Sequence, residues 1–210
     1  MSNTQLIIGN RNYSSWSLRA WLAMRLSGLP FDCVRLSLDT EDFERRIVQY
    51  SPARRVPVLV HEGESIWDSM AIVEYLAELR PTANIWPAEH RSRILARCVS
   101  AEMHGGFTAL RNEMPMNCRA RGRKVPMTDA LRADIEDICR IWHDCRAHVE
   151  RRGDFLFGEF SAADAFFAPV AMRFLTYRPP LRDEAMAYVE AIRQHPWLQE
   201  WVAAARAEPQ

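Results

Sequence analysis

Hydroxyl side chains gather in the first polar loop of the chain, directly before an apolar helical pattern. Ser14 and Ser17 have the spacing of a Cys-x-x-Cys redox pair but carry hydroxyls in place of thiols. Disulfide chemistry is therefore not expected of this loop. A hydroxyl at a helix start can instead donate a hydrogen bond to a thiolate, and the helix dipole favours the same ionised form. The loop predicts a site that activates a thiol carried by a ligand.

A proline stands where a strand is expected. Pro57 lies between two valines in the segment VPVLV at 56–60, where it removes a hydrogen bond of the sheet. A cis peptide bond is one way to keep it, and such a bond turns the N–H and C=O of Val56 toward a partner outside the sheet. A bound peptide could then pair there as an extra strand. The alternative is a proline on an edge strand without any ligand.

An acid and a hydroxyl stand together before the next helical pattern. Asp68 and Ser69 precede the apolar segment that follows. A helix start offers unpaired N–H groups and the positive end of the dipole, so a carboxylate binds there, while a neighbouring Asp pairs with an amine. The pair suits the zwitterionic end of an amino acid. The alternative is that one of them is simply the helix cap.

The elements that must position these residues follow from hydrophobic periodicity, which alternates between strand and helix up to about residue 80. It predicts the order βαβαββα, with strands at 5–9, 33–38, 56–60 and 65–67 and helices at 16–26, 41–50 and 69–79. Beyond a proline-containing linker at 81–88 the pattern is helical, with segments near 89–113, 128–151, 162–176, 183–194 and 197–206. We therefore expect an α/β domain at 1–80 followed by an all-helical domain at 89–210.

The overall charge excludes partners that are bound through summed positive charge. The chain has 27 basic and 27 acidic residues, a formal net charge of zero. Neither a nucleic acid nor a membrane surface is therefore expected as a partner. The basic run that contains Arg119, Arg121, Arg123 and Lys124 is interpreted as a solvated loop.

Cysteines and apolar segments indicate a cytoplasmic protein without a metal. Five cysteines form an odd set without a Cys-x-x-Cys pair, which is typical of reduced thiols. The N-terminal residues do not form a signal peptide, and no run approaches the roughly 18 apolar residues of a membrane span. Four potential metal ligands cluster at Cys139, His143, Cys145 and His148. They point in different directions around a helix, so no metal site is expected.

Taken together, the motifs resemble those of the cytosolic glutathione transferases, over nearly the whole chain. The matching segments are SSWSLRAWLA, RRVPVLV, WDSMAIVEYL and GEFSAADAFFAPV. The last is similar to the family's capping box in the helical domain, with Ser161 and Asp164 at its spacing. The first is similar to the serine-type branch, including zeta and tau relatives, because Ser14 lies five residues before Arg19. Trp16 replaces the cysteine of the zeta pattern.

The resemblance implies a thioredoxin-like first domain that binds glutathione in extended form. The cysteinyl backbone would pair with Val56 beside Pro57, and the γ-glutamyl end would meet Asp68 and Ser69. Either Arg54 or Arg55 would hold the glycyl carboxylate, unless the arginine is merely exposed. Ser14 is the expected catalytic hydroxyl, Ser15 takes its place if the alignment slips by one residue, and Tyr13 is a weaker candidate.

The second substrate would lie between the domains. If residues 89–113 form one helix, His104, Phe107 and Arg111 share a face that would line an electrophile site, and Arg111 would favour an acidic or carbonyl-bearing substrate. A bend at Gly105-Gly106 and a plain core or interface face are the alternatives.

The implied function is conjugation of glutathione to a small electrophile, or isomerisation of one, by a homodimer. The rival interpretation is a carrier that binds glutathione or an apolar ligand without catalysis. A glutathione-dependent reductase is not expected, because the first loop has no cysteine.

Overall fold

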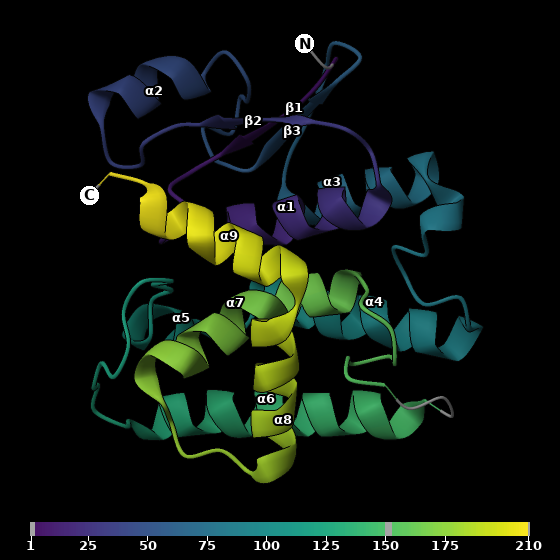
Figure 1. Cartoon of the computed structure of the whole chain (residues 1–210), viewed down its shortest axis with the longest axis vertical. Coiled ribbons are helices and arrows are strands. Elements are labelled where there is room, and N and C mark those ends of the chain that lie inside the picture. The colour runs from purple at the N-terminus through teal and green to yellow at the C-terminus, as the bar shows by residue number, and fades with distance from the viewer. Residues whose placement is uncertain (1–2, 150–152, 210) are drawn as a thin grey trace.

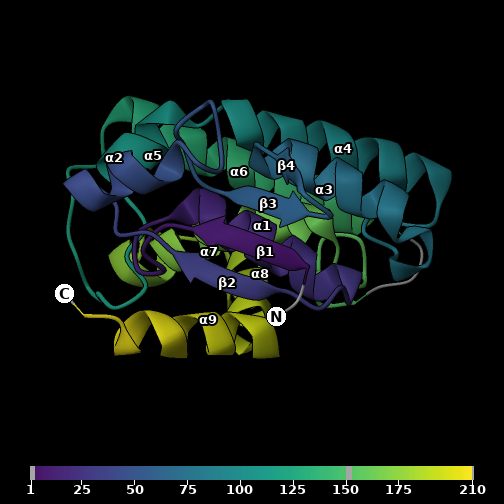
Figure 2. The same cartoon turned by 90° about the horizontal axis from the view of Figure 1, so that it is seen from above.

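The computed structural model describes residues 3–149 and 153–209, which form a small mixed sheet and its helices beside a helical bundle (Figure 1). The strands are β1 (Thr4–Ile8), β2 (Asp32–Arg35), β3 (Val58–His61) and β4 (Glu64–Ile66). They lie in the order β2-β1-β3-β4, visible in Figure 2. The pair β1 and β2 is parallel, and the other two pairs are antiparallel. The predicted βαβαββα order of a thioredoxin-like domain is confirmed.

Helices cover both faces of this sheet. The first domain contributes α1 (Ser15–Ser27), α2 (Glu41–Ile47) and α3 (Ser69–Leu79). Phe43 and Ile47 of α2 pack on one face in a small separate core. Leu22 of α1 and Ile72 of α3 lie on the other face, in the same core as the bundle. The face covered by α1 and α3 is therefore the one that meets the second domain.

The rest of the described chain is helical. It contains a short 3-10 helix at Pro81–Ala83, then α4 (His90–Gly105), α5 (Thr108–Glu113), α6 (Asp129–His148), α7 (Ala162–Tyr177), α8 (Asp183–Gln194) and α9 (Pro196–Ala207). The predicted linker at 81–88 coincides with the 3-10 helix and the irregular residues after it. The last part of the helix predicted at 128–151 lies outside the described residues. None of the described helices has the length and apolarity needed to cross a membrane.

The central helix α7 lies against α1 and is buried along almost its whole length, because its sequence is apolar on every side. The capping box expected at its start is present, with the Asp164 carboxylate accepting hydrogen bonds from the Ser161 N–H and hydroxyl. Tyr188 Oη also donates to Asp164, at 3.0 Å. Burial raises the pKa of Asp164 to about 6 despite these donors. The box thus fixes the helix that supports α1.

Several predicted elements have other bounds in the structure. The single helix at 89–113 is wrong, because the chain leaves the helix after Gly105 and Phe107 adopts a left-handed φ of 57° before α5. At Gly106 an added Cβ would lie 2.8 Å from the Glu102 carbonyl oxygen, so this break requires a glycine. The strand predicted from residue 56 begins only at Val58, so Pro57 precedes the strand. The helix predicted to residue 50 ends at Ile47.

Candidate active site

The start of α1 presents two buried hydroxyls. Ser14 is the N-cap residue, and its Oγ accepts a hydrogen bond from the Ser17 N–H at 3.3 Å. The hydroxyls of Ser14 and Ser17 also bond to each other at 2.7 Å, and the Gly9 N–H donates to Ser17. Ser15 is the first residue of the helix, and the Arg173 guanidinium of α7 donates to its Oγ at 3.5 Å. Ser14 is thus tied to its own helix, and Ser15 contacts the second domain.

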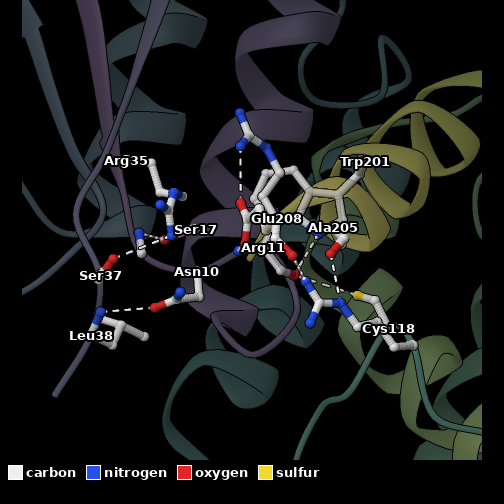
Figure 3. A network of polar contacts seen from close by, with 12 residues as sticks. Asn10, Arg11, Ser17, Arg35, Ser37, Leu38, Cys118, Trp201, Ala205 and Glu208 are labelled. Carbon is white, nitrogen blue, oxygen red and sulfur yellow. Dashed lines mark hydrogen bonds and ion pairs between the residues drawn. The ribbon is translucent and has the colours of Figure 1, made fainter. Parts of the chain in front are cut away.

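The loop before Ser14 is held from two sides (Figure 3). On the sheet side, Asn10 accepts a hydrogen bond from the Leu38 N–H at 2.8 Å. On the other side, the Glu208 carboxylate accepts bonds from the N–H and the guanidinium of Arg11, at 2.9 and 3.0 Å. The Trp201 indole N–H donates to the Arg11 carbonyl at 3.0 Å. The end of the chain therefore fixes the loop that leads into the buried hydroxyls.

The basic segment from 117 onward takes part in the same network of hydrogen bonds, so its side chains are not all exposed to solvent. The Arg119 Nε donates to the Ala205 carbonyl at 2.8 Å, and the guanidinium also contacts the Glu208 carbonyl. The Arg119 N–H donates to the Asn12 side chain. Arg121 and Arg123 remain exposed. The interpretation of this segment as a solvated loop is therefore wrong for Arg119, which ties the first loop to α9.

The peptide bond between Val56 and Pro57 is cis, as expected. Pro57 is buried and Val56 is half-buried directly before β3, so the Val56 backbone is not part of the sheet register. Arg54 and Arg55 are both exposed beside it. The pairing of the Val56 backbone with an extended ligand stays a prediction.

The start of α3 carries a carboxylate and a buried hydroxyl. Asp68 caps the helix, with Oδ1 accepting from the Met70 N–H at 3.0 Å. Its Oδ2 lies 2.8 Å from His104 Nε2 of α4, across the domain boundary. Ser69 is fully buried, and its Oγ has no hydrogen-bond partner among the described residues. Because buried hydroxyls are normally satisfied, Ser69 is suited to a ligand group at this helix start.

Two arginines lie against Trp16 at the domain boundary. The guanidinium carbons of Arg19 and Arg111 are 4.5 and 4.9 Å from the centroid of the Trp16 ring. His104 meets the same ring edge-on, with centroids 5.0 Å apart. Burial lowers the pKa of Arg19, and repulsion from Arg111 and then from Arg173 lowers it further. The boundary next to α1 is thus a region of buried positive charge.

The predicted electrophile residues do not share one helical face. Arg111 Nε donates to the Gly106 carbonyl at 2.7 Å, and its Nη2 donates to the His104 carbonyl, so the side chain caps the end of α4. Phe107 is buried at the break between the helices. His104 faces Asp68 and Trp16. The three residues remain neighbours because the chain folds back at the break. Their role toward an electrophile stays a prediction.

Residues that sequence reasoning missed are Arg173, Trp16 and Glu208, together with the pairing of His104 to Asp68. Arg173 had a local signal, because it is a lone charge in the apolar segment of α7. Trp16 was noted only as a departure from the zeta pattern, and the contacts of Glu208 and of His104 with Asp68 had no local signal, since they join segments far apart in the chain. Tyr13 is largely exposed, with 56% of its surface accessible, whereas the two serines that follow it are buried.

Metal ligands do not converge in the described part of the chain. Nowhere among residues 3–149 and 153–209 do three His, Cys, Asp or Glu side chains come together in a way that could hold an ion. The His143 ring instead pairs with Glu184 at 2.8 Å.

Family models match both halves of the chain. Residues 13–79 match the glutathione S-transferase N-terminal domain, and residues 117–204 match the C-terminal domain. The chain belongs to the glutathione S-transferase family. The matched regions contain the start of α1, the cis-proline, the start of α3 and the capping box. The resemblance expected from the sequence motifs is thus confirmed.

Curated relatives from this family share about a third of the aligned residues. A probable maleylacetoacetate isomerase from Caenorhabditis elegans is 30% identical over 112 residues, which is 53% of this chain and 52% of that protein. A probable glutathione S-transferase from Nicotiana tabacum is 33% identical over 86 residues, 40% of this chain and 38% of that protein. The chain therefore spans about half the length, or less, of the curated relatives that it matches.

Solved structures cover the chain almost completely. A glutathione transferase homolog from Burkholderia, solved with bound glutathione, has a TM-score of 0.73 and 27% identity. The match covers 98% of this chain and 99% of that one. A bacterial zeta-class maleyl pyruvate isomerase has a TM-score of 0.74 at 20% identity over 98% of this chain and all of that chain, a likeness of fold alone. These matches support the two-part arrangement along the whole chain.

Proposed function

We propose that this protein is a glutathione transferase that stabilises the thiolate of glutathione at the start of α1. The observation that carries the proposal is the pair of buried hydroxyls at that helix start, one of which accepts a hydrogen bond from the Arg173 guanidinium of the second domain. A hydroxyl, a helix dipole and nearby cations all favour an ionised thiol over a neutral one. A thiolate is the nucleophilic form that conjugation and thiol-assisted isomerisation both require.

The remaining parts of glutathione have matching positions along the first domain. Its cysteinyl backbone would pair with Val56 beside the cis-proline. The γ-glutamyl carboxylate would accept a hydrogen bond from the buried Ser69 hydroxyl, and the γ-glutamyl amine would pair with Asp68. The exposed Arg55 is the proposed partner of the glycyl carboxylate. The ligand would then lie extended from α3 to the first loop.

An acidic or carbonyl-bearing electrophile suits the second-domain side of the site. Arg111 lies half-buried beside Trp16, close to His104 and Phe107. Its guanidinium provides a positive charge at the boundary between the domains. The similarity to a maleylacetoacetate isomerase adds isomerisation of an unsaturated acid to conjugation as a candidate reaction. In an isomerisation, the thiolate adds to the unsaturated bond and leaves again after rotation, so glutathione is regenerated.

We further propose that the protein is a cytoplasmic homodimer. The family resemblance suggests an interface formed by the end of the first domain and the first helix of the bundle. Exposed apolar side chains lie in these segments, with Trp67, Leu79 and Ile94 each more than a third accessible. Covering such groups lowers the free energy of an assembly. Sedimentation or light scattering would report the mass directly.

Calorimetry with glutathione at millimolar concentration tests the first step. We expect saturable binding to a single site per chain, and absence of binding would refute the proposed function. A titration of the ultraviolet thiolate band then separates an enzyme from a carrier, because a carrier would leave the bound thiol at its ordinary pKa. Maleylacetoacetate and a panel of carbonyl-bearing electrophiles would follow, with turnover measured in the presence and absence of glutathione.

A further inference from the structure

The side chain of Arg173 is a buried cation whose polar contacts lead to the first domain. It lies on α7, and only 4% of its surface is accessible. One terminal nitrogen, Nη1, donates to the Pro169 carbonyl at 3.1 Å within the helix. The other, Nη2, donates to Ser15 Oγ at 3.5 Å, and Nε has no hydrogen-bond partner among the described residues. Arg173 is thus directed at the hydroxyl that begins α1.

The charge of this guanidinium is not balanced by a nearby acid. Within the described chain, no carboxylate lies at ion-pair distance from Arg173. Burial, and then repulsion from Arg111, lowers the pKa of Arg173 to about 10, while Tyr177 and Cys118 oppose the shift. The side chain therefore stays protonated at neutral pH. A buried, unbalanced cation is unfavourable for a fold, since an apolar side chain of similar size would pack there without that cost.

The hydroxyls of the two serines in the loop differ in their capacity to donate a further hydrogen bond. The Ser14 Oγ accepts a hydrogen bond from the Ser17 N–H and is also hydrogen-bonded to the Ser17 hydroxyl. Both of its hydrogen bonds are therefore formed within the helix start. Ser15 accepts from Arg173, which leaves its own O–H free to donate. A hydroxyl that accepts from a cation becomes a stronger donor, because hydrogen bonds in a chain polarise one another. The better donor for a thiolate is therefore Ser15.

We propose that Arg173 is a positioning residue that orients the Ser15 hydroxyl toward the glutathione sulfur and supplies the positive charge that stabilises the thiolate. The inference rests on the proposed function, because it requires a thiol bound at the start of α1. The thiol proton leaves to solvent, and the charge left on sulfur balances the buried guanidinium. Arg19 and Arg111 add to the same positive field, and the Asp68 carboxylate at the start of α3, which is paired with His104, partly offsets that field at Arg19.

The thiol pKa of bound glutathione is the measurement that tests this role. In Arg173→Met we expect it to rise by about 1 to 2 units, because one buried charge near the sulfur is lost. The acidic limb of the kcat/KM profile should move by the same amount. Arg173→Lys should restore part of the shift, since it returns the charge without the planar geometry.

S-methylglutathione separates this electrostatic role from a structural one. It has no ionisable thiol, so its affinity should change less than threefold in Arg173→Met, while glutathione weakens about tenfold above the wild-type thiol pKa. Arg146→Met is the matched control, because Arg146 also has a buried nitrogen without a partner but lies on α6. It should leave the thiol pKa unchanged.

Three results would overturn the inference while leaving the proposed function in place. One is an unchanged thiol pKa in Arg173→Met when wild-type protein binds glutathione with a lowered thiol pKa. Another is an equal loss of affinity for glutathione and S-methylglutathione. The third is an increase confined to the KM of an acidic electrophile, which would make Arg173 a substrate-binding group. If Arg173→Met does not fold, Ser15→Ala and Arg173→Lys provide the same measurement.

Discussion

Two helix starts lie at the domain boundary, and their side chains give them opposite electrostatic surroundings. The start of α1 is buried, carries neutral hydroxyls and receives a guanidinium at Ser15. The start of α3 carries the Asp68 carboxylate, which is 52% exposed and pairs with His104. Both have the same positive dipole end. This difference is the basis for the proposal that the start of α1 stabilises a negative charge on a ligand and that the start of α3 binds a zwitterion.

Burial decides how strongly each site acts on a ligand. Charge interactions are several times stronger in the buried surroundings of α1 than at an exposed carboxylate, where water screens them. We therefore assign chemistry to the start of α1 and ligand affinity to the start of α3. The following predictions test that division, and we order them by expected effect.

The largest effect is expected at the start of α1. Ser15→Ala should reduce kcat/KM by about 100-fold, because the donor to the thiolate is lost. Ser14→Ala should mainly lower the free energy of unfolding, by about 1 kcal/mol, since it removes the helix cap. Steady-state kinetics and chemical denaturation measure the two quantities. A larger kinetic loss in Ser14→Ala would return the catalytic role to Ser14, as the family resemblance suggests.

The next effect concerns ligand affinity at the start of α3. Asp68→Asn keeps a good helix cap but removes the charge that would pair with the γ-glutamyl amine. We expect glutathione to bind about tenfold more weakly, with the thiol pKa and the melting temperature nearly unchanged. Calorimetry and the ultraviolet titration test this. A shifted thiol pKa would contradict the separation of the two sites.

A smaller effect is expected from the contact between Glu208 and Arg11, which holds the first loop. Glu208→Ala leaves the N–H and guanidinium of Arg11 without their carboxylate, which should cost about 1 to 3 kcal/mol of unfolding free energy. We expect kcat to fall only a few-fold, because the hydroxyls themselves remain. Glu200→Ala is the matched control, since Glu200 lies on α9, shortly before Glu208, and forms an exposed ion pair with Arg25 of α1. Equal losses of unfolding free energy in both variants would show that the contact of Glu208 with Arg11 has no specific role in holding the loop.

The smallest effect is a pH dependence at the cross-domain pair. Burial lowers the pKa of His104, and repulsion from Arg19 and Arg111 lowers it further, while Asp68 raises it. His104 therefore has a lower pKa in the folded protein than in the unfolded chain. As the pH falls below about 6.5, the unfolded chain binds a proton at this residue before the folded protein does. The contribution of His104 to stability is therefore present above that pH and lost below it. Denaturation of wild type and His104→Gln across pH 5 to 8 should show a steeper decline for wild type. Parallel curves would exclude the effect.

Local signals account for most of the fold and for the identity of the helix starts. A cap such as Asp68 acts on its own first turn, so its function is visible in a short segment. Pro57 likewise restricts its own peptide bond. These are the residues for which the sequence-based expectations and the structure agree.

The helix predicted at 89–113 failed at a break within its own segment. The pattern at 89–113 is compatible with one helix, yet the chain breaks at Gly106 and Phe107, and Arg111 caps the released carbonyls. Periodicity reports which residues favour a buried face, but it does not report where a glycine lets the backbone leave the helix. The grouping of His104, Phe107 and Arg111 was therefore predicted for the wrong geometric reason.

The sequence by itself determined the order of elements, the family motifs and the two candidate helix starts, because these depend on residues close together in the chain. Only the tertiary structure decided which hydroxyl meets a cation, which residue pairs with Asp68, and what holds the first loop. Arg173 and Ser15 are 158 residues apart, and Arg11 and Glu208 are 197 apart. Charges at such separations come together only through packing of the domains, and that packing sets the dielectric surroundings in which they act.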